Sequence, residues 1–92
     1  MIETFKHKGI KGFFTKGKGD KIPSKYKRKI KMILEILNAA SDLNDINFPG
    51  SNLHKLQGEM KEYWSVKVNG NWRIIFKFDQ GKVFDVNFID YH

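Results

Sequence analysis

Hydrophobic residues in the first part of the chain recur with the period of a helix. Ile10, Phe13 and Phe14 are spaced i, i+3 and i+4, which predicts a short amphipathic helix. Gly9 and Gly12 lie in the same stretch and weaken this helix, because glycine is among the poorest helix formers. We therefore expect a helix of only a few turns here.

A longer stripe predicts a second helix. It consists of five apolar side chains at i, i+4, i+7, i+8 and i+11: Tyr26, Ile30, Ile33, Leu34 and Leu37. Pro23 suits the first helical position, and we expect the helix to run to about Ala40. Residues 1–5 predict an edge strand, and residues 41–52 predict a turn or short helical piece followed by a loop.

After residue 50 the period changes from helical to alternating, which predicts β-strands. Three runs of alternating apolar residues carry this pattern: Trp64, Val66 and Val68; Trp72, Ile74, Phe76 and Phe78; Phe84, Val86 and Phe88. Helices followed by an antiparallel meander predict an α+β fold, with the N-terminal helices packed on one face of an antiparallel sheet.

The same pattern predicts the register, because a slip of one residue would move every side chain to the other face. A three-residue loop at 69–71 opposes Val68 to Trp72, Val66 to Ile74 and Trp64 to Phe76. A three-residue loop at 79–81 opposes Phe76 to Phe84, Ile74 to Val86 and Trp72 to Phe88. We expect these loops, although Asn-Gly is the usual signature of a two-residue turn.

The composition indicates one domain, residues 1–92, with 40% hydrophobic residues and eight Phe for a single core. The absence of cysteine excludes disulfide frameworks, zinc knuckles and thiol catalysis. The first residues do not have the pattern of a secretory signal, and no stretch approaches the length of a membrane span. We therefore expect a cytoplasmic protein that is not bound to a membrane.

The net charge of +7 favours a polyanionic partner, and the charge is unevenly placed. Residues 5–31 hold twelve basic side chains, His7 included, and one acid. Cations at the start of the second helix oppose its macrodipole, so phosphate binding explains them better than stability does. The alternative is an ordinary solvated face. The predicted RNA or ribosome contacts in this region are Lys16, Lys18, Lys21, Lys25, Lys27, Arg28 and Lys29.

The last residues of the chain also predict a site. Alternation places Asp90 and His92 on the side of Phe88, at the rim of the core past Trp72, where an acid and an imidazole can form a proton-transfer pair. The alternative is a polar tail that closes a strand. His54 together with Asp90 and His92 imitates a two-His, one-carboxylate metal site, but no His pair has i, i+4 spacing, so we expect no metal.

Three segments, FKHKGIKGFF, LHKLQGEMKEYWSVKVNGNWRIIFKF and DVNFIDYH, together resemble the HigB toxins, a branch of the RelE/ParE superfamily. The resemblance implies a RelE-like domain and a toxin of a type II toxin–antitoxin system. HigB-like toxins are ribosome-dependent endoribonucleases that cut mRNA in the A site without a metal or another cofactor. The implied partners are the ribosome, mRNA and a HigA-type helix-turn-helix antitoxin, whose complex with the toxin binds operator DNA.

The resemblance also implies site residues. The functional positions of the family fall on His54, Asp90, Tyr91 and His92, and Arg73 is a candidate phosphate stabiliser. We assign His92 as the leading acid or base, Asp90 as its orienting group and His54 as the second proton-transfer group. Tyr91 would stack or position the RNA. The alternatives for His54 and Arg73 are a partly buried polar residue and a surface ion-pair partner.

Two features depart from the pattern. Many family members have proline and lysine where this chain has Lys55 and Gln57, and Lys55 is a further candidate for RNA contact. Strict alternation also places Arg73 and Tyr91 on the face opposite Asp90 and His92. Two other functions compete with the nuclease: a ParE-like toxin that inhibits DNA gyrase by binding, and a basic nucleic-acid-binding module without catalysis.

Overall fold

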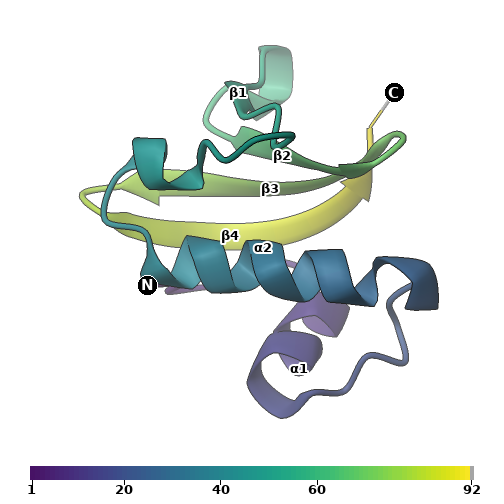
Figure 1. The fold of residues 1–92 in the computed structure, drawn as a ribbon. Coiled ribbons are helices and arrows are strands. Elements are labelled where there is room, and N and C mark those ends of the chain that lie inside the picture. Colours follow the sequence, from purple (N-terminus) through teal and green to yellow (C-terminus); the bar gives the residue numbers. More distant parts are fainter. Residues whose placement is uncertain (92) are drawn as a thin grey trace.

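One layer of the fold is a four-stranded antiparallel sheet and the other is a pair of helices (Figure 1). The computed structural model describes residues 1–91. The helices are α1 (Lys8–Lys16) and α2 (Lys27–Ala39), with 3₁₀ turns η1 (Ser24–Tyr26), η2 (Leu43–Ile46) and η3 (Gly58–Met60). The strands are β1 (His54–Lys55), β2 (Trp64–Asn69), β3 (Trp72–Asp79) and β4 (Lys82–Asp90), and they lie side by side in this order. The predicted α+β fold is confirmed.

The ends of the helices follow from local chemistry. The N-cap of α1 is His7, whose Nδ1 accepts a hydrogen bond from the Ile10 amide at 3.0 Å. The helix ends at Gly17, whose φ of 71° lies in the left-handed region that favours glycine. The second helix was predicted to begin at Pro23, and this is wrong. Pro23 precedes the turn η1, and α2 itself begins at Lys27.

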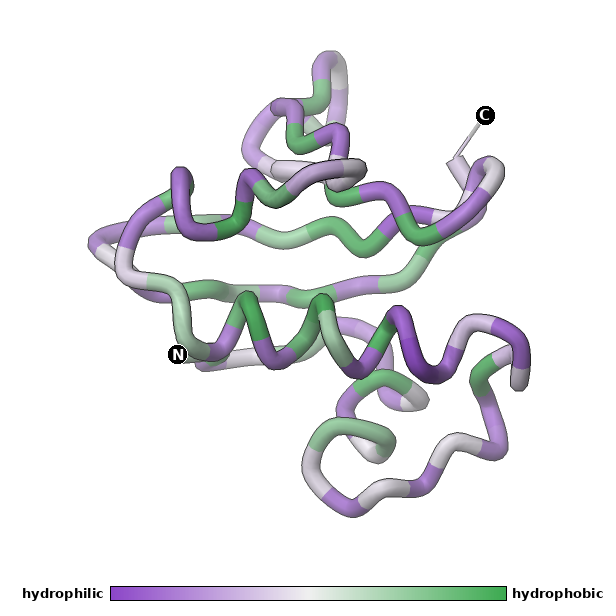
Figure 2. Tube along the Cα trace, viewed as in Figure 1, coloured by the Kyte–Doolittle hydropathy of each residue, from purple (hydrophilic) through white to green (hydrophobic). Residues whose placement is uncertain are grey.

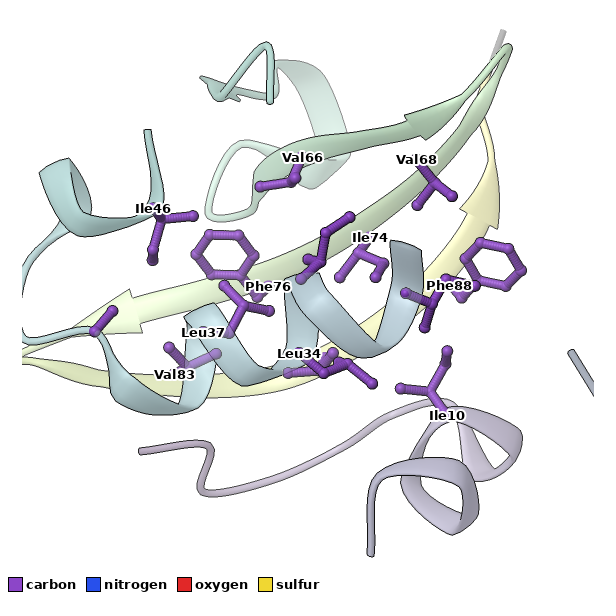
Figure 3. Packing of buried hydrophobic residues seen from close by; sticks show 14 of the residues in the cluster. Ile10, Leu34, Leu37, Ile46, Val66, Val68, Ile74, Phe76, Val83 and Phe88 are labelled. Carbon is purple, nitrogen blue, oxygen red and sulfur yellow. The ribbon is translucent and has the colours of Figure 1, made fainter. Parts of the chain in front are cut away.

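The core lies between α2 and the sheet, with Ile10 of α1 at its lower edge (Figure 3). Leu34 and Leu37 face Ile74 and Phe76 of β3, and all of these side chains are fully buried. Figure 2 shows that the hydrophobic positions of α2 lie on the side that faces the sheet. Burial of each such side chain contributes about 1.5–3 kcal/mol, so this stripe holds the two layers together.

The predicted pairing of β2 with β3 is partly confirmed. Val66 pairs with Ile74 and Trp64 pairs with Phe76, as the pattern predicts. The loop is shorter than expected, because Asn69 pairs with Trp72 and only residues 70–71 form the turn. The predicted opposition of Val68 to Trp72 is therefore wrong. Val68 is an extra residue on β2, and this bulge restores the hydrophobic register beyond it.

The predicted pairing of β3 with β4 is wrong. Asp79 pairs with Lys82 across a two-residue turn, in which Gln80 and Gly81 have φ of 48° and 77°. A bulge follows at Asp85, whose φ is 52°. The observed pairs along the strands are Lys77 with Phe84, Ile75 with Asn87, Ile74 with Phe88 and Trp72 with Asp90.

The two-residue β3–β4 turn and the bulge at Asp85 affect the two ends of β4 differently. The shorter loop and the bulge each shift the register by one residue, so residues beyond the bulge keep the faces that alternation predicts. Phe84, before the bulge, does not. It is half-buried outside the core cluster, and Val83 takes the expected core position.

The edges of the sheet are formed by two short segments. Residues 1–5 run parallel to β4, with bridges from Ile2 to Val83 and from Phe5 to Val86, so the predicted edge strand is confirmed as isolated bridges. At the other edge β1 pairs with β2, His54 opposite Ser65 and Lys55 opposite Trp64. No strand was predicted here, and β1 places His54 in a defined position on the sheet.

Candidate active site

The sheet face away from the helices carries polar residues at positions that alternate with the core. We call it the distal face, and its residues are His54, Ser65, Lys67, Arg73, Ile75, Asn87 and Ile89. Ile75 is almost fully buried there although it lies outside the main core cluster. The distal face is thus partly covered and carries cationic side chains.

His54 is held on this face by β1. The residue is half-buried, and its Nδ1 lies 2.8 Å from the carbonyl oxygen of Asn52. A carbonyl oxygen only accepts, so Nδ1 carries the proton and donates this hydrogen bond. In the neutral ring Nε2 then has the free lone pair. His54 can therefore accept a proton at Nε2, as a general base must.

Arg73 lies on the distal face too, on β3. It pairs with Lys67 on β2 and with Ile89 on β4. Its Nε and Nη1 are buried and have no hydrogen-bond partner within residues 1–91, although the residue as a whole is only half-buried. Buried donors without a partner cost about 1–3 kcal/mol, and a phosphate oxygen would satisfy them.

Lys67 is a further basic residue beside Arg73. The two residues face each other directly across β2 and β3, and like charges in such a pair are destabilising. Lys67 is half-buried and forms no salt bridge within the described part of the chain. An anion between the two side chains would remove the repulsion. Sequence reasoning missed Lys67; its place opposite Arg73 in the predicted register was the available signal.

The register brings His54 and Arg73 near each other. His54 is opposite Ser65, and Arg73 is opposite Lys67 two residues further along β2. From the rise per residue and the spacing of strands, their Cα atoms lie roughly 12 Å apart on one face. The two side chains can therefore contact one phosphodiester group from two sides.

The end of β4 is tied to the β2–β3 turn. The amide of Tyr91 donates a hydrogen bond to the carbonyl of Asn71 at 2.8 Å, which continues the β3–β4 ladder by one residue. By alternation Tyr91 is on the side of Arg73, whereas Asp90, opposite Trp72, is on the helix side. The predicted separation of these residues onto two faces is confirmed as far as Tyr91. The prediction that Asp90 lies past Trp72 is wrong, because of the register shift described above. His92 lies outside the described residues.

The predicted RNA or ribosome contacts fall into two groups. Lys55 is exposed on β1, with its Nζ 5.7 Å from the centre of the Trp64 ring. The others lie on the last turn of α1, on the connection to α2 and on the first turn of α2, at the opposite side of the molecule (Figure 1). All of them are exposed except Lys27, which is half-buried. The first turn of α2 contains no acid, as expected.

A surface hollow of about 600 Å³ is lined by none of the predicted catalytic residues that the structure describes, His54, Arg73, Asp90 and Tyr91. It lies across the other end of the sheet and is lined by Thr4, Lys55, Glu62, Trp64, Lys77, Phe78, Asp79, Phe84 and Asp85. Lys55, which lines this hollow, is the neighbour of His54 on β1. Within residues 1–91, no group of three or more His, Cys, Asp or Glu side chains is arranged to hold a metal ion.

His7 belongs to the fold rather than to the distal face. Its ring packs edge-on against Phe88, with centroids 6.0 Å apart, while its Nδ1 caps α1. Burial lowers the pKa of His7 below its usual value of 6.5, although a hydrogen bond of its own backbone acts in the opposite direction. The sequence did not indicate this role, because histidine is not a common N-cap residue.

Comparison with known proteins identifies the family. The family model for RelE-like toxins of the type II toxin–antitoxin system HigB matches residues 3–92. Endoribonuclease HigB of Proteus vulgaris is 38% identical over 92 residues, which is the full length of both chains. Toxin HigB-1 of Vibrio cholerae is 34% identical over 83 residues, 88% of this chain and 87% of that one.

The fold has a counterpart among solved structures. A histidine-to-glutamine mutant of YafQ from E. coli superposes with a TM-score of 0.63 at 21% identity, over 96% of this chain and 89% of that one. At this identity the likeness shows the fold alone. No helix within residues 1–91 is long and apolar enough to cross a membrane. Because the family model spans nearly the whole chain, the protein belongs to the HigB-like, RelE-like toxins of type II toxin–antitoxin systems.

Proposed function

We propose that this protein is the toxin of a type II toxin–antitoxin system and an endoribonuclease that cleaves mRNA in the ribosomal A site and inhibits translation. The observation that carries the proposal is the placement of His54 and Arg73 on the distal face, with guanidinium nitrogens that lack a partner within residues 1–91. The full-length similarity to Endoribonuclease HigB of Proteus vulgaris supports the activity.

The proposed reaction is an internal transfer of the phosphodiester. Nε2 of His54 takes the proton of the ribose 2′-OH, and the 2′-oxygen then attacks the adjacent phosphorus. The bond to the 5′-oxygen of the next nucleotide breaks, which leaves a 2′,3′-cyclic phosphate. His92 supplies the proton to the leaving oxygen, and Asp90 orients His92. A positioned acid or base of this kind contributes roughly 10²–10⁴-fold each.

Arg73 stabilises the charge that develops on the phosphorane. Its fork of donors suits two oxygens of one phosphate, and two of its nitrogens, Nε and Nη1, have no hydrogen-bond partner within residues 1–91. Tyr91 is exposed and lies at the end of the same face, where its ring can stack on a base next to the scissile bond. We therefore propose that His54 and Arg73 act from the distal face, whereas Asp90 lies at the end of β4 on the helix side.

The basic residues of the helical layer are the proposed contacts to ribosomal RNA. They lie on the far side from His54, so they orient the toxin on the ribosome and do not take part in the chemistry. Contacts of lysine and arginine with phosphate give affinity without sequence information. Binding to the ribosome should therefore weaken as the salt concentration rises.

The proposed partners follow from the family. A toxin of this class requires an antitoxin, and we propose a HigA-type helix-turn-helix protein, with operator DNA bound only by the toxin–antitoxin complex. The ribosome and mRNA as partners place the toxin in the cytoplasm. The ParE-like alternative, inhibition of DNA gyrase by binding, finds no support in the comparisons, which match the HigB-like toxins.

Primer extension on mRNA from cells that briefly express the toxin tests this function. Wild type should produce in-frame cuts, and both His92→Gln and Arg73→Gln should remove them while the proteins remain folded. Undiminished cuts with both variants would place the chemistry elsewhere on the molecule. Growth arrest without cuts, together with inhibited DNA supercoiling, would support the ParE-like alternative.

A further inference from the structure

The loop before β1 contains an unusual backbone position. Asn52 has a φ of 48°, in the left-handed region that residues other than glycine rarely adopt. Asparagine is among the few residues that enter this region at low cost, because its short polar side chain bonds locally. Such a conformation two residues before His54 points to a functional constraint on this loop.

A hydrogen bond joins this residue to the imidazole of His54. The carbonyl oxygen of Asn52 lies 2.8 Å from Nδ1 of His54. In this bond the backbone carbonyl accepts and the imidazole N–H donates. The hydrogen bond made by one ring nitrogen determines what the other nitrogen can do.

We propose that Asn52 is a positioning residue of the active site, whose left-handed backbone directs its carbonyl at Nδ1 of His54. This contact keeps the proton on Nδ1 and leaves Nε2 unprotonated and aimed away from the backbone. His54 is thereby the general base for the 2′-OH, and it needs no carboxylate to orient it. The role of His54 as general base rests on the proposed nuclease function. The proton position on its ring does not depend on that function.

The ring on the other face of the sheet provides an internal reference. Nδ1 of His7 accepts a hydrogen bond from the Ile10 amide, so in the neutral ring of His7 the proton is on Nε2. The two histidines therefore have opposite tautomers in one molecule. This difference can be observed without any substrate.

The first measurement is the ¹⁵N spectrum of the imidazole rings of the full-length wild-type chain, at a pH where both rings are neutral. The expected result is a protonated Nδ1 for His54 and a protonated Nε2 for His7. A protonated Nε2 on His54 would overturn the proposal, whatever the activity of the toxin.

The second measurement is the rate of cleavage of ribosome-bound mRNA by variants of Asn52. Asn52→Gly keeps the left-handed conformation available and should retain nearly the wild-type rate. Asn52→Val cannot adopt it without strain, and its kcat should fall about 10²-fold at a similar KM, because misplacement of a catalytic group has this order of effect. The ¹⁵N spectrum of Asn52→Val should show His54 with mixed tautomers.

Variants of His54 separate this proposal from the proposed function. If His54→Gln is inactive and Asn52→Val keeps the wild-type rate, the positioning role is wrong and the nuclease function stands. If Asn52→Gly loses as much activity as Asn52→Val, the left-handed backbone is not what the site requires, and the proposal fails. If His54→Gln cleaves like wild type, the catalytic assignment of His54 is wrong.

Discussion

The two faces of the sheet use the same residue type for different purposes. On the helix face, His7 is packed against Phe88, and its Nδ1 accepts a hydrogen bond that begins α1. On the distal face, His54 is half-buried on a two-residue strand, and its Nδ1 donates to Asn52. The first ring satisfies the backbone, whereas the second has a nitrogen left for a ligand.

The two faces also differ in the kind of side chain that they carry. The core side chains of the helix face, such as Ile74 and Phe76, are apolar and fully buried, and their burial stabilises the fold. On the distal face Lys67 lies opposite Arg73, whose buried nitrogens have no partner among the described residues. Such an arrangement lowers stability unless an anion binds. We infer that the helix face maintains the structure and that the distal face is kept for function.

The largest effect on activity is expected for His54→Gln. Loss of the proposed general base should lower the rate of mRNA cleavage roughly 10²–10⁴-fold, while the free energy of unfolding stays near that of wild type. The matched control is His7→Gln, which should be fully active when folded but less stable. The comparison of the two faces fails if the two substitutions have the same effect on rate.

The largest effect on stability is expected in the core of the helix face. Leu34→Ala removes a fully buried side chain of α2 and should lower the free energy of unfolding by about 2–5 kcal/mol. Urea denaturation followed by circular dichroism measures this change. Met32→Ala, at an exposed position of the same helix, should change stability by only about 0.5 kcal/mol. Equal losses for both variants would contradict the assigned packing of α2.

A smaller effect, dependent on pH, is expected from His7. Its pKa is lowered in the folded state, so the unfolded chain binds the proton more tightly. The contribution of the neutral ring is fully present above its unfolded pKa of 6.5 and is lost as the pH falls through the folded pKa. Denaturation of wild type and of His7→Gln between pH 8 and pH 5 tests this, because that range extends above and below the ordinary pKa of histidine, about 6.5.

Wild type should lose more stability than His7→Gln as the pH falls, and the loss of the cap itself should cost about 1 kcal/mol at neutral pH. Parallel curves for the two proteins would show that the His7 ring does not titrate in this range. In that case its role as a pH-dependent cap would be withdrawn.

The smallest effect is expected from the ion pair of Lys77 with Asp85. The two charged groups are 3.4 Å apart, and both side chains are more than a third exposed. Asp85→Asn keeps a residue that tolerates the φ of 52° and should cost less than about 1 kcal/mol, with no change in cleavage. A loss of several kcal/mol, measured by thermal unfolding at low and high salt, would contradict this weak contribution.

The helices and the hydrophobic strands were predictable because their periods are long and regular. The stripe from Ile30 to Leu37 was sufficient for α2, and the alternation from Trp72 to Phe78 was sufficient for β3. The faces of Arg73 and Tyr91 relative to Asp90 also followed from alternation, since the two shifts in β4 cancel in parity.

The remaining features depend on single residues with unusual backbone conformations. The bulge at Asp85 and the turn at Gln80 require a positive φ that the residue types at these positions did not predict. Phe84 was therefore assigned to the wrong face. Likewise, β1 is too short for any periodic signal, and the contact of Asn52 with His54 depends on one carbonyl. Such local geometry is decided by tertiary packing rather than by pattern.

Substitution of Arg73 by an apolar residue of similar size tests the division between the two faces most directly. Cleavage of ribosome-bound mRNA and the free energy of unfolding should be measured for wild type and Arg73→Met. Removal of buried donors that have no partner within residues 1–91 should leave stability unchanged or raise it. Removal of the charge that we propose to stabilise the phosphorane should lower the rate about 10²–10³-fold. An Arg73→Met protein that cleaves at the wild-type rate, or that unfolds several kcal/mol more easily, would contradict the account.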